Sequence, residues 1–129
     1  MDERAGLLKV FLVEDSALLR ERLEAMLASI HGSITVGSAS GADDALQAIL
    51  ASGADTVVLD LHLAQGSGME VLRALSERAP QVQVYILTNY PNDAYRRAAE
   101  RLGARGFFDK STEFEQLRAA LAARVSESS

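Results

Sequence analysis

The chain has 129 residues, of which 48% are hydrophobic and 24% are charged, and its formal net charge is -5. This length suits one globular domain, and the composition excludes a disordered chain. The 13 Lys and Arg residues are scattered among 18 Asp and Glu residues, so we expect no direct contact with nucleic acid. Cysteine is absent, which excludes disulfides and thiolate metal sites.

The N-terminal residues do not predict a secretory or membrane segment. Residues 1–4 include three charges, and the apolar run 7–13 is interrupted by Lys9. A helix that spans a membrane needs about 20 apolar residues, so this run is too short. We therefore expect a cytoplasmic protein with no membrane contact.

In the first half of the chain, short apolar runs alternate with segments of helical period. Residues 7–13 predict a first strand, and apolar residues then recur at helical spacing over 18–30. Residues 33–38 predict a second strand, and 42–52 predict a helix that ends at Gly53.

The same alternation continues around the most apolar strand of the sequence. Residues 56–60 are apolar up to Asp60, as expected for a central parallel strand that is covered on both faces. A loop follows, and then a helix from Met69 that must end before Pro80, because the residue preceding a proline disfavours helix.

The last third of the chain predicts two further pairs of a strand and a helix. Residues 82–87 and 106–109 predict strands, and 93–102 and 114–125 predict helices. The helix at 93–102 has few apolar residues, which indicates weak packing against the rest of the fold.

Five strand and helix pairs in alternation predict an α/β fold of (βα)₅ type, doubly wound around a five-stranded parallel sheet. We find no internal repeat and no linker, so 1–129 is expected to be one domain. Its core is predicted at about 7–125, with a frayed tail at 126–129. We also expect a stand-alone, single-domain protein without an output domain.

Polar residues stand where the expected strands end, and these ends share one edge in a parallel sheet. They are Glu14, Asp15, Asp60, Thr88 and Lys110. Three clustered carboxylates repel one another, so they are expected to bind a divalent cation or to have a raised pKa. Mg²⁺, which prefers oxygen ligands, fits best.

An aspartate beside such a cation can act as a nucleophile toward phosphorus. Asp60 is the expected nucleophile. The ammonium of Lys110 would neutralise the phosphoryl oxygens, and the hydroxyl of Thr88 would donate a hydrogen bond to one of them.

From about residue 7 to residue 125, the chain resembles the receiver domain of two-component response regulators, which has a flavodoxin-like fold. The resemblance rests on five motifs: Val-Glu-Asp-Ser at 13–16, Val-Leu-Asp at 58–60, Gly-Ser-Gly-Met-Glu at 66–70, Leu-Thr at 87–88 and Phe-Asp-Lys at 108–110.

The resemblance implies roles for individual residues. Asp60 would be the phosphoacceptor, with Thr88 and Lys110 as its catalytic partners. Phe107 would be the switch aromatic, which turns inward when the threonine moves toward the phosphoryl group. The Mg²⁺ ligands would be Glu14, Asp15, Asp60 and the backbone carbonyl of His62.

The resemblance also implies a function. The protein would be a signalling switch in a two-component or phosphorelay pathway, phosphorylated by a histidine kinase or a histidine phosphotransfer protein. A downstream target protein would recognise the phosphorylated form. We do not expect an enzyme with an external substrate, because the domain catalyses only its own phosphotransfer and autodephosphorylation.

The sequence departs from the family pattern near the expected site. Ser111 and Leu63-Ala64 replace, respectively, a common proline and a common methionine-proline pair, and Asn89 replaces a smaller residue. His62 and Tyr90 occupy positions that flank the phosphoryl group in this family. Two rings there predict a phosphorylated form that lasts longer than that of fast chemotaxis regulators.

Three other functions fit the sequence less well. A haloacid dehalogenase-type phosphatase needs a second aspartate where His62 stands, and a cobalamin-binding motif needs a glycine where Gln65 stands. The alternative that stays open is a receiver-like module that docks proteins without phosphorylation. The presence of all five polar residues argues against it.

Overall fold

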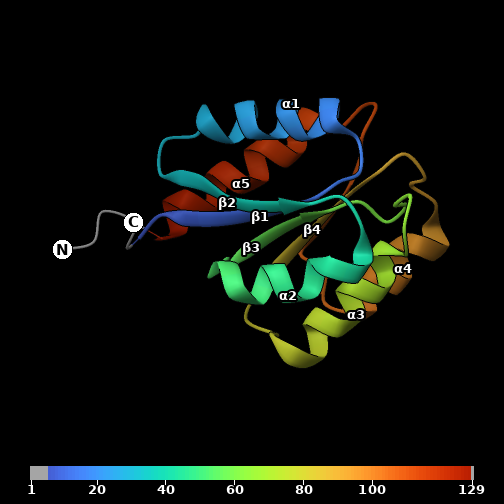
Figure 1. Ribbon diagram of the computed structural model, residues 1–129. Helices are drawn as coiled ribbons and strands as arrows, with labels where there is room; N and C mark the ends of the chain where they lie inside the picture. The colour runs from blue at the N-terminus through green and yellow to red at the C-terminus, as the bar shows by residue number, and fades with distance from the viewer. Residues whose placement is uncertain (1–5, 129) are drawn as a thin grey trace.

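Five parallel strands form one sheet in the order β2-β1-β3-β4-β5 (Figure 1). They belong to a computed structural model that describes residues 6–128. The predicted charged start at 1–4 and the last residue of the predicted tail, Ser129, lie outside the described residues. The elements are β1 (Leu8–Val13), α1 (Ala17–Ala28), β2 (Ser33–Ala39), α2 (Ala42–Ser52), β3 (Thr56–Leu59), α3 (Gly68–Arg78), β4 (Gln83–Thr88), α4 (Asp93–Arg101), β5 (Gly106–Asp109) and α5 (Phe114–Ser128).

The predicted α/β class and the (βα)₅ topology are confirmed. The bounds predicted for α2 and β5 are those of the structure, and Gly53 ends α2 in the left-handed conformation with φ 75°. The extent of the domain stays a prediction. Helix α5 continues to Ser128, so the tail predicted at 126–129 is helical as far as that residue.

Helix α1 ends earlier than its apolar spacing indicated. The helix stops at Ala28, although Ile30 is buried. The N–H of Ile30 donates to the carbonyl of Leu27, only three residues back, and the hydroxyl of Ser33 also donates to that carbonyl. The apolar spacing thus continues through a tight turn that is no longer α-helical.

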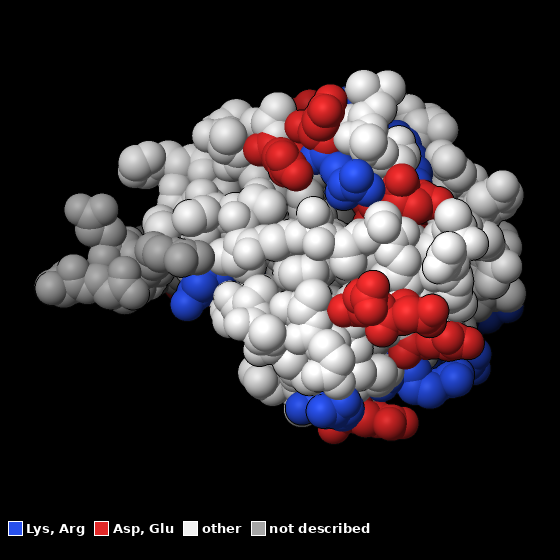
Figure 2. All heavy atoms as spheres, in the orientation of Figure 1, with Lys and Arg blue, Asp and Glu red and all other residues white. Residues whose placement is uncertain are grey.

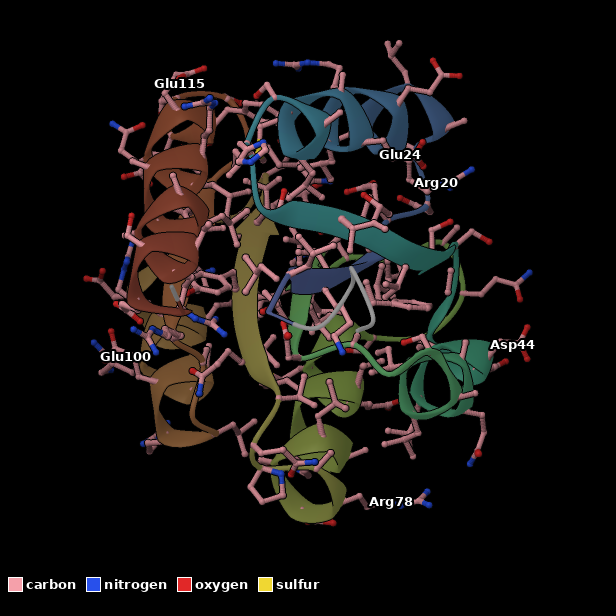
Figure 3. All side chains as sticks on the ribbon, turned by 90° about the vertical axis from the view of Figure 1, so that its left-hand side faces the viewer. Arg20, Glu24, Asp44, Arg78, Glu100 and Glu115 are labelled. Atoms are coloured by element: carbon pink, nitrogen blue, oxygen red, sulfur yellow. The ribbon has the colours of Figure 1, made fainter. Side chains whose placement is uncertain are left out.

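Helices cover both faces of the sheet, with α1 and α5 on one side and α2, α3 and α4 on the other (Figure 1). Alternate residues of β1 pack into two hydrophobic cores, one on each face of the sheet. Val10 and Leu12 pack toward α1 and α5, whereas Phe11 and Val13 pack toward the other three helices. This alternation is the period of two that a strand imposes. Figure 3 shows charged side chains that project outward from the helices, at Glu24, Asp44, Arg78 and Glu100.

Charged side chains of both signs lie close together on the surface. On the face shown in Figure 2, blue and red groups adjoin one another above and below a band of uncharged residues.

No helix among residues 6–128 is long and apolar enough to cross a membrane. The peptide bonds within that range are all trans, including the one between Lys110 and Ser111.

Side-chain caps begin three of the helices at the edge of the sheet where the strands end. The Ser16 hydroxyl accepts the N–H of Leu19, and the Ser67 hydroxyl accepts the N–H of Met69. The Asn92 side-chain oxygen accepts the N–H of Tyr95 at 2.8 Å. Each cap satisfies a backbone donor that a helix start leaves without a partner, and so fixes where the preceding loop ends.

Gly68, the first residue of α3, packs directly against the strand that leads to the expected site. Its N–H donates to the carbonyl of Leu61 at 3.0 Å. A Cβ at this position would collide with the backbone oxygen of Asp60 and with the Cα of Leu61. Because these are backbone atoms, they have no freedom to turn aside.

We therefore expect Gly68→Ala to destabilise the protein by about 1–3 kcal/mol, the usual cost of an added carbon in a filled space. Urea unfolding measures this change. Gly41→Ala is the control: a Cβ there meets only Gln65, at 3.4 Å, so this variant should lose only the smaller amount that alanine costs at the N-cap of α2. Equal stability of the two variants would contradict the steric argument.

Candidate functional site

Backbone hydrogen bonds extend the strand ladders into the loops that carry the expected site residues. The N–H of Asp60 donates to the carbonyl of Val13 at 3.0 Å, across the β1–β3 pair. The N–H of Lys110 donates to the carbonyl of Thr88 at 2.9 Å, across the β4–β5 pair. Thr88 itself is the last residue of β4, one position beyond the strand end predicted at residue 87, because it pairs with Asp109. The parallel register therefore brings these side chains to one edge.

Lys110 binds two buried carboxylates. Its Nζ lies 2.8 Å from Oε1 of Glu14 and 2.9 Å from Oδ2 of Asp60. Glu14 is 2% exposed and Asp60 is 4% exposed. Buried carboxylates are costly unless they are paired and hydrogen-bonded, and the ammonium supplies both.

Burial and the neighbouring charges shift two pKa values in the site. Burial raises the pKa of Glu14, although the hydrogen bond from Lys110 opposes the rise. Burial by itself lowers the pKa of Lys110, but its hydrogen bonds to Glu14 and Asp60 outweigh this effect and raise the pKa. Since the ordinary lysine pKa is already 10.5, Lys110 is an ammonium at neutral pH.

Three carboxylates converge at this edge, in a geometry suited to a cation. One oxygen each from Glu14, Asp15 and Asp60 lie within 4.8 Å of one another. Glu14 and Asp60 are buried, whereas Asp15 is exposed. Carboxylate oxygens are the ligands that Mg²⁺ prefers, so the residues present fit this ion.

The acidic residues are oriented by donors that the sequence did not reveal. The N–H of Ala64 donates to Oδ2 of Asp15 at 2.9 Å, from the loop that follows β3. Arg20 donates to the carbonyl of Glu14 at 2.7 Å. A proline at position 64 has no N–H, so the departure from the family pattern at Ala64 provides this donor.

Backbone donors also orient the two residues expected to handle the phosphoryl group. Oδ1 of Asp60 accepts the N–H of His62 at 3.1 Å. The hydroxyl oxygen of Thr88, which is fully buried, accepts the N–H of Tyr90 at 3.1 Å. The role predicted for the His62 carbonyl as a metal ligand stays a prediction.

Phe107, the expected switch aromatic, lies inside the protein. It is 7% exposed and belongs to the core beneath α2, α3 and α4, whereas Phe108 packs on the opposite side of the sheet. The Arg96 guanidinium on α4 lies 4.7 Å from the centre of the Phe107 ring and donates to the Phe107 carbonyl at 3.4 Å. No sequence motif indicates this contact, and the switch role of Phe107 stays a prediction.

Known proteins share this fold and this sequence pattern. A family model for the response regulator receiver domain matches residues 10–122. The DNA-binding transcriptional activator DevR/DosR of Mycobacterium tuberculosis is 33% identical over 115 residues, which are 89% of this chain and 53% of that protein. The response regulator GacA of Pseudomonas aeruginosa is 29% identical, over 89% of this chain and 54% of that protein.

A solved structure is also similar over nearly the whole chain. The LuxR-family two-component response regulator from Aurantimonas sp. SI85-9A1 matches with a TM-score of 0.85 and 26% identity. The match covers 94% of this chain and 86% of the chain of that regulator. The chain belongs to the response regulator receiver domain family. It spans about half the length of the curated relatives named above.

Removal of the Lys110 ammonium leaves Glu14 and Asp60 buried without a cation. We expect Lys110→Met to lower the free energy of unfolding by about 3–5 kcal/mol in the absence of divalent ions. Mg²⁺ should stabilise this variant more than the wild type, because it replaces the missing positive charge.

Urea unfolding with and without Mg²⁺ measures both effects. Lys9→Met is the control, because Lys9 is the chain's other lysine and lies on β1 away from the carboxylates. An unfolding midpoint of Lys110→Met that does not respond to Mg²⁺ would contradict the placement of a cation beside Glu14 and Asp60.

Proposed function

We propose that this domain is a phosphorylation-dependent switch of a two-component or phosphorelay pathway, with Asp60 as the phosphoacceptor. One observation carries the proposal. The Lys110 ammonium joins Glu14 and Asp60 at the buried edge of the sheet, 2.8 and 2.9 Å from their oxygens. A buried carboxylate beside a fixed ammonium and two further carboxylates is the arrangement that phosphoryl transfer to aspartate needs.

Phosphotransfer follows from the contacts of Asp60. A carboxylate oxygen of Asp60 attacks the phosphorus of a phosphohistidine on a histidine kinase or a phosphotransfer protein. The P–N bond breaks, and its electron pair stays on the imidazole nitrogen, which takes up a proton. Lys110 neutralises charge on the phosphoryl oxygens, and Thr88 turns its hydroxyl to donate a hydrogen bond to one of them.

Glu14, Asp15 and Asp60 would hold Mg²⁺, with the His62 carbonyl as a further ligand. Bound there, the ion would supply positive charge to compensate that of the phosphoryl oxygens. Arg20 and the N–H of Ala64 hold the acidic residues in position for it.

The phosphorylated state ends by hydrolysis within the same site. A water oxygen attacks the phosphorus, the bond between phosphorus and the Asp60 oxygen breaks, and its electron pair returns to the carboxylate. Inorganic phosphate leaves and a proton passes to solvent. The domain thus regenerates itself and needs no separate substrate.

The partners follow from this chemistry. We propose a histidine kinase or phosphotransfer protein as the phosphodonor and a target protein that reads the phosphorylated form, in the cytoplasm. The mixed charges of the chain argue against direct contact with nucleic acid. The docking module without phosphorylation is not favoured, because it has no need for the buried Lys110 and its two carboxylates.

Beryllofluoride with Mg²⁺, which mimics a phosphoryl group on aspartate, tests the proposal. The wild type should show a higher melting temperature and shifted amide resonances around Asp60, Thr88 and Lys110. Asp60→Asn should show neither change, because the amide lacks the carboxylate that the fluoride complex binds.

Asp44→Asn serves as the control, since Asp44 points outward from α2 (Figure 3) and should leave the response as in the wild type. An unchanged wild-type spectrum would reject the phosphoacceptor and support the docking module. A response that persists in Asp60→Asn would place the binding elsewhere.

A further inference from the structure

Three aromatic side chains from separate segments meet at the rim of the site. The ring centres of His62 and Tyr90 lie 4.3 Å apart with the planes tilted by 49°. The Tyr95 ring lies 5.3 Å from that of His62, at 71°, in an edge-to-face contact. We call these residues the aromatic cluster. His62 follows β3, Tyr90 follows β4, and Tyr95 belongs to α4.

The backbone of the aromatic cluster contacts the two residues that would handle the phosphoryl group. The N–H of His62 donates to Asp60, and the N–H of Tyr90 donates to the hydroxyl oxygen of Thr88, both at 3.1 Å. The ring contact between His62 and Tyr90 therefore joins the loop after Asp60 to the loop after Thr88.

Tyr95 is the member of the cluster with a helical backbone. Its N–H donates to the Asn92 side chain at 2.8 Å, in the capped first turn of α4. Its ring also lines a hollow with Leu63 and Met69, next to His62. His62 and Tyr90, in contrast, are loop residues, although all three side chains are exposed. The helix thus gives Tyr95 a fixed position from which its ring restrains the imidazole.

We propose that Tyr95 is a positioning residue that holds the His62 ring against Tyr90 and thereby slows the loss of the phosphoryl group from Asp60. The inference rests on the proposed function. It assigns to α4 a part in the lifetime of the phosphorylated state, through a contact with the loop that follows the phosphoacceptor.

The physical reason lies in the path of the attacking water. Hydrolysis requires a water oxygen in line with the phosphorus, opposite the Asp60 oxygen whose bond breaks, as the proton passes to solvent. Two rings that pack across the loops after Asp60 and Thr88 restrict this approach. Without Tyr95, the His62 ring keeps its contact with Tyr90 but regains rotamer freedom. It then covers the site for a smaller fraction of the time.

The decay of the radiolabelled phosphoform tests the role of Tyr95. A labelled small-molecule phosphodonor is removed, Mg²⁺ is kept in excess, and the label on the protein is followed. Tyr95→Leu should shorten the lifetime about twofold to tenfold, the effect that one aromatic contact can supply. Tyr95→Phe keeps the ring and should decay as the wild type does.

Two further variants control for changes in the helix itself. Tyr95→Ala also removes the ring and should match Tyr95→Leu, so the result does not depend on the folding of one variant. Arg97→Ala alters an exposed residue of the same helix and should leave the lifetime unchanged. A wild-type lifetime in both Tyr95→Leu and Tyr95→Ala would overturn the proposal.

A double-mutant cycle decides whether Tyr95 acts through His62. His62→Ala removes the imidazole, and Tyr95→Leu should then add little or no further acceleration. An acceleration by Tyr95→Leu that is equally large in both backgrounds would show a general effect on α4 and would overturn the positioning role.

The same assay separates this inference from the proposed function. If the wild type takes up no label, or if Asp60→Asn takes up as much, the proposed function fails before lifetimes can be compared. If the wild type is labelled on Asp60 but the Tyr95 variants lose the label at the wild-type rate, the proposed function stands and the role of Tyr95 fails.

Discussion

The ammonium of Lys110, shared between Glu14 and Asp60, is the interaction on which the site depends. Two carboxylates at 2% and 4% exposure would repel each other strongly without it. The lysine follows β5 and its partners follow β1 and β3, so the contact forms only when the strands lie in the order β2-β1-β3-β4-β5 and in the observed register. The strand order and register that define the fold are therefore also what brings the site residues together. A phosphoryl group arriving at Asp60 would meet positive charge that the fold has already placed.

Much of this arrangement is predictable from the sequence, because it follows from strand ends. The alternation of strands and helices, together with the rule that ligands gather at the carboxyl edge, predicts that Asp60, Thr88 and Lys110 lie together. The contacts that the sequence does not predict depend on side-chain direction or on the backbone of distant loops. The N–H of Ala64 reaches Asp15 across 49 positions of the chain, and Tyr95 carries no motif of its own.

Helix α4 connects these features in a way that its composition only partly indicated. Its polarity predicts weak packing, and Ala99 is its one buried residue. Yet Tyr95 contacts the loop after Asp60, and Arg96 covers Phe107 on β5. The contacts of this helix thus include one with the loop after Asp60 and one with the neighbouring strand β5.

The central claim is that one carboxylate, Asp60, accepts the phosphoryl group. Reductive trapping tests it most directly, because borohydride converts an aspartyl phosphate into homoserine. The phosphorylated protein is reduced and digested, and the peptides are read by mass spectrometry. We predict homoserine at position 60 and at no other aspartate. Homoserine at Asp15 or at another aspartate, or none in a protein that carries label, would contradict the claim.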